Sequence, residues 1–344
     1  MQHKSSKTNQ LFAEEFRLDK INKQSDPLLK LNQRITWEEF RSMLNEALQK
    51  ENKGIGGRRP YDYVMMFKIL ILQRYYNISD DKTEFAILDR LSFMRFLGLT
   101  LSDSVPDAKT IWNFREKLIE SGIIEKLFEL FQAQLKAKGL IANEGKIIDA
   151  SFVEVPIQRN SKEENEQIKQ GETPKRWEEN PNKLAQKDTD AKWTKKNDTD
   201  YFGYKNHIKA DEESKLIDSY AVTDASVHDS QVVEPLLTEQ DEGQTLYADS
   251  AYSGQPIAEI VSKAKMTNCI HEKGYRNRPL SKEQKESNRT KSKTRARVEH
   301  IFGFIENSMN GSYIRTIGIK RATAVIGLMN LTYNMFRYIQ LSQV

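Results

Sequence analysis

Lys146-Ile147-Ile148-Asp149 is the stretch that decides how this chain is expected to fold, and Leu246-Tyr247-Ala248-Asp249 repeats its pattern. Each reads as a short, buried β-strand that ends in an acidic residue. An acid directly after a buried apolar strand is unfavourable unless it is paired or binds a cation. A single acid of this kind is ordinarily a helix N-cap or a turn residue. Two of them in one sheet favour a shared functional site.

The second half of the chain alternates strand-like and helix-like runs around these two stretches. Further strands are expected at 202–210, 216–223 and 268–271, and helices at 231–238, 255–264, 294–307 and 322–339. This order predicts an α/β sheet with crossover helices. Because active groups in open α/β sheets gather at the carboxyl ends of strands, we expect Asp149 and Asp249 to lie at two such ends. Residues 158–200 are polar and poor in aliphatic side chains, which predicts a long, partly disordered excursion.

Residues 1–140 show the apolar spacing of helices and form an expected all-helical domain, followed by the α/β domain at 141–344. Helices are predicted at about 36–50, 61–76, 80–97, 107–120 and 123–138. Thr36 to Glu39 has the pattern of a capping box, and Asp107 is expected to cap the helix that follows it. The predicted apolar positions of the 80–97 helix are Phe85, Leu88, Leu91 and Phe93.

The helix that begins at Asp107 follows another helix after a short turn, which resembles a helix-turn-helix. Lys109, Asn113 and Arg115 lie at or near its polar face, where such side chains can reach phosphates and base edges. The alternative interpretation is the solvated face of an ordinary helical bundle.

Composition limits the class of protein. The chain has 344 residues, 38% hydrophobic and 30% charged, with a net charge of +4. This is enough for a sizeable core and indicates a mildly basic protein without a polybasic tail. The lone Cys269 leaves no disulfide framework, which fits a reducing cytosol, and disfavours a Cys/His zinc site. We expect no secretion signal at Met1 to Gln10 and no membrane span.

A third acid, Glu299, lies on the expected helix 294–307, at the edge of the buried stripe that Val298, Phe302 and Ile305 form. Arg295 is four residues earlier and projects from the same face. One interpretation is a plain ion pair worth a few tenths of a kcal/mol, roughly as in isolated helices. The other is a metal ligand with a phosphate-holding arginine beside it.

Three carboxylates suit the hydrolysis of phosphodiesters, which needs positioning and charge neutralisation rather than a protein nucleophile. Two Mg²⁺ ions roughly 3.5–4 Å apart supply both. Mg²⁺ takes hard oxygen ligands and few of them from the protein. One aspartate can bridge the ions while the other two acids each anchor one.

The acidic motifs occur with further motifs in a fixed order. The stretches are 148–151, 202–207, 222–230, 247–252, 297–303 and 328–334, and the acids are spaced 100 and 50 residues apart. As an ordered set they resemble bacterial insertion-sequence DDE transposases, over roughly residues 10 to 340. The resemblance implies an RNase H-like mixed sheet flanked by helices, preceded by an all-helical DNA-binding domain. It also implies that Asp149, Asp249 and Glu299 are the catalytic, metal-binding triad.

The resemblance further implies what the protein acts on. It would bind the terminal inverted repeats of an insertion sequence, hydrolyse the 3′ ends, and join the 3′-OH groups to target DNA. The cofactor would be two Mg²⁺ ions, with Mn²⁺ as a substitute, and the assembly on DNA a homodimer or a higher oligomer. The location would be the bacterial cytoplasm, associated with the nucleoid. Relatives carry a Tyr and a Lys around the catalytic Glu where this chain has Ser292 and Glu306.

DNA contacts are predicted from charge. Residues 276–297 hold nine Lys or Arg and two acids directly before the Glu299 segment, which favours a track for the DNA backbone over a merely solvated run. Trp193, among lysines, either stacks on an unpaired base or anchors the excursion. His207, His228 and His271 are expected to be structural. The predicted contacts are Arg289, Lys291, Lys293, Arg295, Arg297, Lys205, Lys109, Asn113, Arg115 and Trp193.

Two alternatives to a transposase remain at this point. One is a domesticated DDE nuclease that cleaves without strand transfer. The other is a catalytically silent DNA-binding regulator, against which the intact carboxylates argue. A tyrosine or serine recombinase is disfavoured, because no arginine–histidine constellation is evident around Tyr333.

Overall fold

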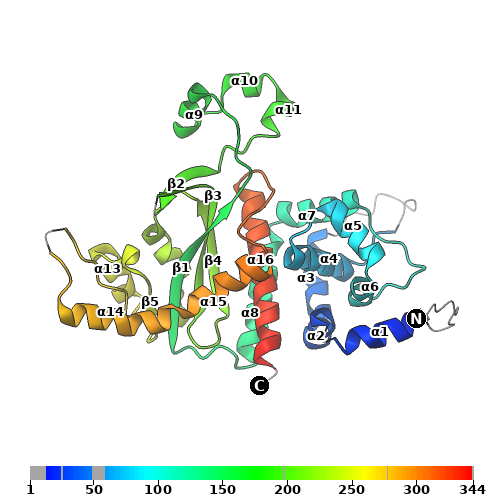
Figure 1. Ribbon diagram of the computed structural model, residues 1–344, viewed down its shortest axis with the longest axis horizontal. Helices are drawn as coiled ribbons and strands as arrows, with labels where there is room; N and C mark the ends of the chain where they lie inside the picture. The colour runs from blue at the N-terminus through cyan, green and yellow to red at the C-terminus, as the bar shows by residue number, and fades with distance from the viewer. Residues whose placement is uncertain (1–12, 25, 49–58, 197, 277, 343–344) are drawn as a thin grey trace, which may run out of the picture. The chain divides into compact units, whose positions relative to one another are not determined.

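The computed structural model describes residues 13–24, 26–48, 59–196, 198–276 and 278–342 (Figure 1). Two compact units make up the chain: residues 1–73 with 78–117, and residues 74–77 with 118–344. The N-terminal stretch on which the expected absence of a secretion signal rests lies outside the described residues. None of the helices that the structure describes combines the length and apolar character needed to cross a membrane.

The first unit is all-helical, as predicted. Its helices are α1 (Ala13–Asn22), α2 (Pro27–Arg34), a 3₁₀ turn (Trp37–Phe40), α3 (Arg41–Leu48), most of α4 (Tyr63–Tyr76), α5 (Asp80–Asp89), α6 (Leu91–Leu97) and most of α7 (Ala108–Glu120). Asp107 caps α7 by accepting a 2.7 Å hydrogen bond from the backbone N–H of Thr110, which confirms that prediction. The end of the helix expected to run to Lys50 lies outside the described residues.

Two local predictions in this unit are wrong. Thr36 makes no side-chain capping bond, because a 3₁₀ turn forms there in place of the expected first turn of α-helix. The single helix expected over 80–97 is broken at Arg90, whose backbone is extended at φ −110° and ψ 110°. Phe85 and Leu88, which were expected to be buried, lie on the outer face of α5 and are 68% and 60% exposed.

The second unit is built on a six-stranded mixed sheet. Its strands are β1 (Gly145–Glu154), β2 (Lys192–Lys196), β3 (Thr199–Asp211), β4 (Ile217–Asp224), β5 (Thr245–Tyr247) and β6 (Thr267–Asn268). They lie in the order β2-β3-β1-β5-β6, and β4 also pairs with β3. The mixed sheet flanked by helices, together with the all-helical N-terminal region, confirms the predicted fold class.

The sheet register brings the two aspartates together. β1 and β5 are parallel, and their last paired residues are Ile147 and Tyr247. Asp149 and Asp249 each lie two residues beyond this last pair. The two neighbouring backbone segments therefore carry an acid at the same level of the sheet. The expectation that Asp149 ends its strand is wrong, because β1 continues to Glu154 and Asp149 pairs with Ile208 of β3. β1 extends beyond the end of β5 because the opposite edge of β1 is paired along its length with the long strand β3.

The excursion after β1 is more ordered than its composition suggests. It forms α9 (Lys162–Lys169), α10 (Lys175–Glu178) and α11 (Pro181–Leu184), packed on the fully buried ring of Trp177. The Trp177 indole N–H donates to Glu164 at 2.7 Å. β2, which lies inside the predicted excursion, pairs with β3. Although the segment is highly charged, its three short helices pack around one buried tryptophan, Trp177.

Helices cover the sheet on both sides. Val232 and Val233, with α12 (Val233–Leu236) and α13 (Gln255–Lys263), form one core with Ile148 and Leu246. α16 (Ile319–Leu341) runs alongside α8 (Ile123–Ala137) and β4 (Figure 1). Asn206 of β3 and Asn330 of α16 exchange two amide hydrogen bonds of 2.8 and 3.0 Å, both side chains being buried.

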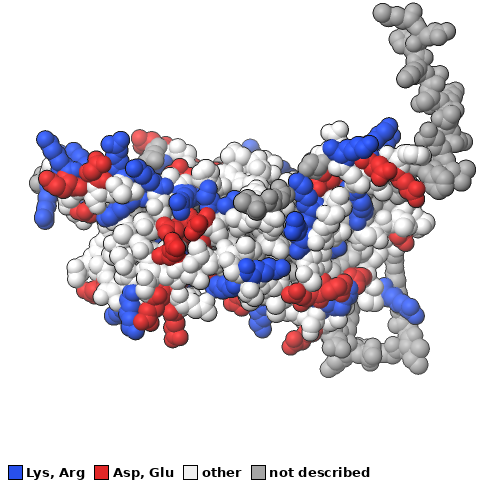
Figure 2. All heavy atoms as spheres, turned by 90° about the horizontal axis from the view of Figure 1, so that it is seen from below, with Lys and Arg blue, Asp and Glu red and all other residues white. Residues whose placement is uncertain are grey.

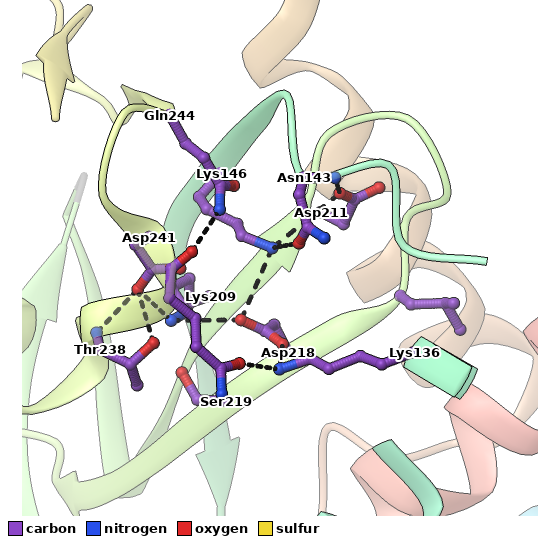
Figure 3. A network of polar contacts seen from close by, with 12 residues as sticks. Lys136, Asn143, Lys146, Lys209, Asp211, Asp218, Ser219, Thr238, Asp241 and Gln244 are labelled. Atoms are coloured by element: carbon purple, nitrogen blue, oxygen red, sulfur yellow. Dashed lines mark hydrogen bonds and ion pairs between the residues drawn. The ribbon is translucent and has the colours of Figure 1, made fainter. Parts of the chain in front are cut away.

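Buried lysines and aspartates balance one another at one end of this sheet (Figure 3). Lys209, with no exposed surface, contacts Asp241 at 2.5 Å and Asp218 at 3.2 Å. Lys146, 1% exposed, lies 3.6 Å from Asp218, and Lys136 lies 3.2 Å from it. Burial raises the pKa of Asp218, but the three ammonium groups outweigh it and hold this pKa below its usual value.

We predict that Asn206→Ala and Asn330→Ala each lower the free energy of unfolding by about 2 kcal/mol, because each leaves the other buried amide unpaired. The double variant should lose less than the sum of the two, because no unpaired partner remains. Urea denaturation measures all three. Asn182→Ala, on exposed α11, is the control and should change little; strict additivity of the pair would contradict the prediction.

Candidate catalytic carboxylates

Asp149 and Asp249 are positioned by different means. Asp149 is fixed by the pairing of β1 with β3, and its side chain, 16% exposed, faces away from the core that Ile148 joins. Asp249 lies just beyond β5 and caps the 3₁₀ turn Ser250–Tyr252, accepting a 2.7 Å hydrogen bond from Ala251 N–H. The helix-cap interpretation of Asp249 is therefore correct in itself, and the cap leaves the carboxylate beside Asp149.

Glu299 reaches this place through Arg295. Arg295 Nη1 lies 3.0 Å from Asp149 Oδ2, and its Nη2 lies 3.3 Å from Glu299 Oε1. The i,i+4 ion pair between Arg295 and Glu299, which the helix alone suggests, is therefore present. The same Arg295 guanidinium also contacts Asp149 on β1. Arg295 is 23% exposed in its side chain, whereas Glu299 is 65% exposed. The structure thus brings the third acid to the same end of the site as Asp149.

The segment that carries Arg295 and Glu299 is two helices in place of the single one expected. α14 (Lys282–Arg295) ends at Ala296, and α15 (Arg297–Gly303) begins directly after it, so Glu299 lies in the first turn of α15. The basic run at residues 276–297 is thus mostly α14, which buries no residue. Figure 2 shows Lys and Arg side chains, interspersed with acids, over the end of the molecule where α14 lies.

Burial dominates the charge state of Asp149. Burial, and to a smaller extent the charge of Asp249, raise the pKa of this carboxyl to about 6, against the lowering effects of the Ala150 N–H and of Arg295. Two neighbouring carboxylates therefore repel each other at neutral pH, and one guanidinium does not compensate fully. A site in this state favours an additional cation.

The donor set fits a hard divalent cation. All three side chains offer carboxylate oxygens, and the Arg295 guanidinium stands as a cation between Asp149 and Glu299. Within the described residues, no three acidic, histidine or cysteine side chains converge closely enough to hold a metal ion as they stand. A metal held by all three carboxylates would therefore require them to move closer together and Arg295 to release at least one of its two contacts.

Several predicted DNA contacts are engaged elsewhere. Lys205 is ion-paired with Asp229 at 2.8 Å and is 10% exposed in its side chain. Arg115 pairs with Asp80 at 2.7 and 2.8 Å. Arg297 donates to a backbone carbonyl at 2.9 Å. These three cations hold the fold together in this structure, which sequence spacing could not reveal because their partners are distant in the chain.

Other predicted contacts are accessible to a ligand. Lys109, Arg289 and Lys293 are exposed, and Asn113 is half-buried on α7. Lys291 is half-buried and donates to the backbone carbonyl of Ile270 at 3.0 Å. Trp193 on edge strand β2 is 51% exposed, and its ring lies 5.1 Å from that of Phe202. The ring is thus anchored on one side and accessible from the other.

Two neighbours of the carboxylates were not found from the sequence. Ser151, two residues beyond Asp149 on the same face of β1, donates to Glu306 at 2.9 Å. Glu306 lies in a π-helical turn, Phe304–Ser308, which continues α15. The Tyr252 hydroxyl is buried without a hydrogen-bond partner among the described residues. Its pKa is raised well above the usual value, first by burial and then by the charges of Asp149, Asp229 and Asp249.

We predict that, without metal, Asp149→Asn stabilises the protein at pH 8 and not near pH 3. Below about pH 3 the carboxyl is mostly protonated in both the folded and unfolded states and contributes little, because its ordinary pKa is 3.8. Above the folded pKa of about 6, the folded state carries a charge that burial disfavours. The difference corresponds to up to about 3 kcal/mol. Urea denaturation in a chelator measures it, and an equal effect at both pH values would contradict the assignment.

Comparison with known proteins places this chain in a family. The family described as "Transposase domain (DUF772)" matches residues 16–117, and the family "Transposase DDE domain" matches residues 142–335. The cryo-electron microscopy structure of a piggyBac transposase synaptic complex with hairpin DNA has 13% sequence identity and a TM-score of 0.46, over 92% of this chain and 75% of that one. That likeness is too weak to carry an argument, whereas the DDE family match covers more than half of this chain. The chain therefore belongs to the DDE transposases, which are metal-dependent enzymes that cleave DNA and transfer its strands.

Proposed function

We propose that Asp149, Asp249 and Glu299 are the catalytic triad and hold two Mg²⁺ ions, for which Mn²⁺ can substitute. The proposal is carried by the parallel register that places Asp149 beside Asp249, with Glu299 joined to Asp149 through Arg295. When bound, the ions supply charge neutralisation at the attacking and leaving oxygens of the phosphodiester. The raised pKa of Asp149 records the unfavourable negative charge that the cations would offset.

Arg295 has two roles in this proposal. Without metal, its guanidinium balances Asp149 and Glu299. With the carboxylates closed around metal, one N–H edge of the guanidinium would become available to a phosphate oxygen. The planar fork of donors on this edge suits such an oxygen well. Arg295 is at the end of α14, so the same helix that carries exposed Lys293 and Arg289 leads the DNA backbone to the carboxylates.

The substrate is proposed to be the terminal inverted repeats of an insertion sequence, followed by target DNA. Lys109 and Asn113 of α7 would read the repeats from the helical domain at 1–140, and exposed Trp193 would stack on an unpaired base. The catalytic domain would span 141–344. Two ends must be joined in concert, so we propose a homodimer or higher oligomer on DNA, in the bacterial nucleoid.

Strand transfer distinguishes this proposal from a stand-alone nuclease. A pre-cut end with a free 3′-OH should be joined to a target plasmid in Mg²⁺ or Mn²⁺. Light scattering of the protein with end DNA would report the proposed dimer or higher oligomer. Hydrolysis of ends without joining would favour the nuclease, and DNA binding without either reaction would favour the silent regulator.

We predict that Asp249→Asn lowers cleavage of end-containing DNA in Mg²⁺ by at least about 100-fold, because an amide is a weak ligand for a hard cation. Glu299→Gln should have the same effect. Gel-based cleavage assays measure both, with binding to the same DNA as the control for folding. Asp200→Asn, an exposed acid on β3, should cleave normally. Full activity of Asp249→Asn would refute the proposed site.

We predict that Arg295→Gln shifts metal and DNA binding in opposite directions. Removal of the competing cation should tighten Mg²⁺ binding by roughly ten-fold, because the carboxylates lose their neutralising partner. DNA binding should weaken, because a phosphate contact is lost. Titration calorimetry for Mg²⁺ and fluorescence anisotropy for DNA separate the two. Weaker binding of both ligands would contradict the proposed exchange.

A further inference from the structure

A third parallel segment of the sheet ends beside the two aspartates. β5 and β6 are parallel, and Leu246 is paired with Asn268. The chain keeps this register beyond β6, because the His271 N–H donates to the Ala248 carbonyl at 3.1 Å. His271 lies three residues beyond Asn268, and Asp249 lies three residues beyond Leu246. The two residues are therefore neighbours at the same level of the sheet.

His271 also shares the face of the two aspartates. The residues that directly precede Asp149, Asp249 and His271 all lie in one buried core, namely Ile148, Ala248 and Ile270. Successive side chains of an extended chain point to opposite faces of a sheet. His271 thus points away from this core, as Asp149 and Asp249 do.

The segment around His271 is held in place by α14, which contacts β5 (Figure 1). The Asn288 side chain makes two hydrogen bonds of 2.9 Å with the backbone of Glu272, one to its N–H and one to its carbonyl. One turn further along α14, Ser292 Oγ lies 3.3 Å from His271 Nε2. Both the backbone and the ring of this segment are therefore positioned by the same helix.

The Ser292 hydroxyl decides which ring nitrogen of His271 carries the proton. Its single hydrogen is donated to the Asn288 carbonyl at 2.8 Å, so Oγ can only accept from Nε2. The lone pair of the neutral ring is then at Nδ1, which has no hydrogen-bond partner within the part of the chain that the structure describes. A metal-ligating histidine typically donates its other ring N–H in this way, which fixes the tautomer and the orientation of the ring.

The surroundings keep the ring neutral. Burial lowers the pKa of His271, and the charges of Arg295 and Lys291 lower it further, against the opposing effect of Asp249. The ring thus lies close enough to Asp249 to sense its charge. Lys291 is already engaged, since it donates to the Ile270 carbonyl at 3.0 Å. At neutral pH the imidazole therefore offers a lone pair beside a carboxylate.

The spacing of parallel strands suits one ion between Asp249 and His271. Neighbouring strands lie about 4.8 Å apart. Two ligand bonds of about 2.1 Å each join donor atoms up to about 4 Å apart, so an ion can bridge side chains that stand on adjacent strands. Asp149 is two strand spacings away from His271, roughly 10 Å at the backbone. His271 can therefore serve the ion at Asp249 and leaves the other ion to Asp149 and Glu299.

We propose that His271 is a nitrogen ligand of the metal ion at Asp249, and that Ser292 is a positioning residue for its ring. This inference rests on the proposed carboxylate site and adds one ligand to it. Imidazole nitrogen binds transition-metal ions, whereas Mg²⁺ takes hard oxygen ligands. The ion at Asp249 should therefore favour a transition metal such as Mn²⁺ over Mg²⁺ more strongly than carboxylates alone would.

Pulsed electron paramagnetic resonance of Mn²⁺ bound to the full, DNA-free chain tests this ligand, because a directly bonded nitrogen nucleus modulates the electron spin echo. We expect nitrogen modulation in the wild type and its loss in His271→Gln. Labelling the histidines with the heavier nitrogen isotope should change the modulation without any substitution. His300→Gln, which replaces an exposed histidine next to Glu299, is the matched control and should keep the signal. Modulation that survives His271→Gln, or that is lost in the control, would overturn the proposal.

Affinity measurements by calorimetry separate this ligand from the carboxylate site. His271→Gln should weaken Mn²⁺ binding by roughly ten-fold or more and Mg²⁺ binding by less, and Ser292→Ala should weaken Mn²⁺ binding by about ten-fold. Equal losses for both ions in His271→Gln would contradict a nitrogen ligand. Asp249→Asn should remove both the ion and the nitrogen modulation. If Asp249→Asn abolishes Mn²⁺ binding but the wild type shows no modulation, His271 is refuted and the carboxylate site stands.

Discussion

The parallel pairing of β1 with β5 is the constraint on which the arrangement of the proposed catalytic carboxylates depends. Ile147 opposite Tyr247 is the last pair of the ladder, and each strand supplies its acid two residues further on. A slip of one residue would turn one of the two carboxylates to the opposite face of the sheet. The long antiparallel β3 holds β1 on its other edge, so this register is fixed from both sides.

Two aspartates with little exposed side-chain surface differ in how far the fold neutralises their charge. Asp218 lies near three lysines, and its pKa is held below the usual value despite burial. Asp149 has one arginine and a second carboxylate nearby, and burial raises its pKa to about 6. The first is neutralised by the fold itself. The second is left with an excess of negative charge at neutral pH, which is the condition that a cation-dependent site requires.

Apolar periodicity and strand-end acids are local signals, and they predicted the helical N-terminal region, an α/β sheet and the pair of aspartates. The mixed, RNase H-like character of the sheet was implied by the family resemblance. The sequence did not predict that β1 continues past Asp149, because the partner that extends it, β3, comes some fifty residues later. Nor did the sequence show that Lys205 and Arg115 are ion-paired within the fold and are not free, exposed cations. Only the fold identifies their partners, which are Asp229 for Lys205 and Asp80 for Arg115. The roles of the three acids stay predictions that metal and DNA must test.

α14 contains fourteen residues and buries none of them. Its place is held by a few polar contacts, among them Asn288 with the backbone of Glu272 and Lys291 with that of Ile270. Substitutions along its outer face therefore cost little folding stability, since no core packing is lost. A lineage can change the charge and hydrogen-bonding pattern that this helix presents while the carboxylates beside it stay in place. If α14 contacts DNA as proposed, DNA recognition can evolve separately from the chemistry.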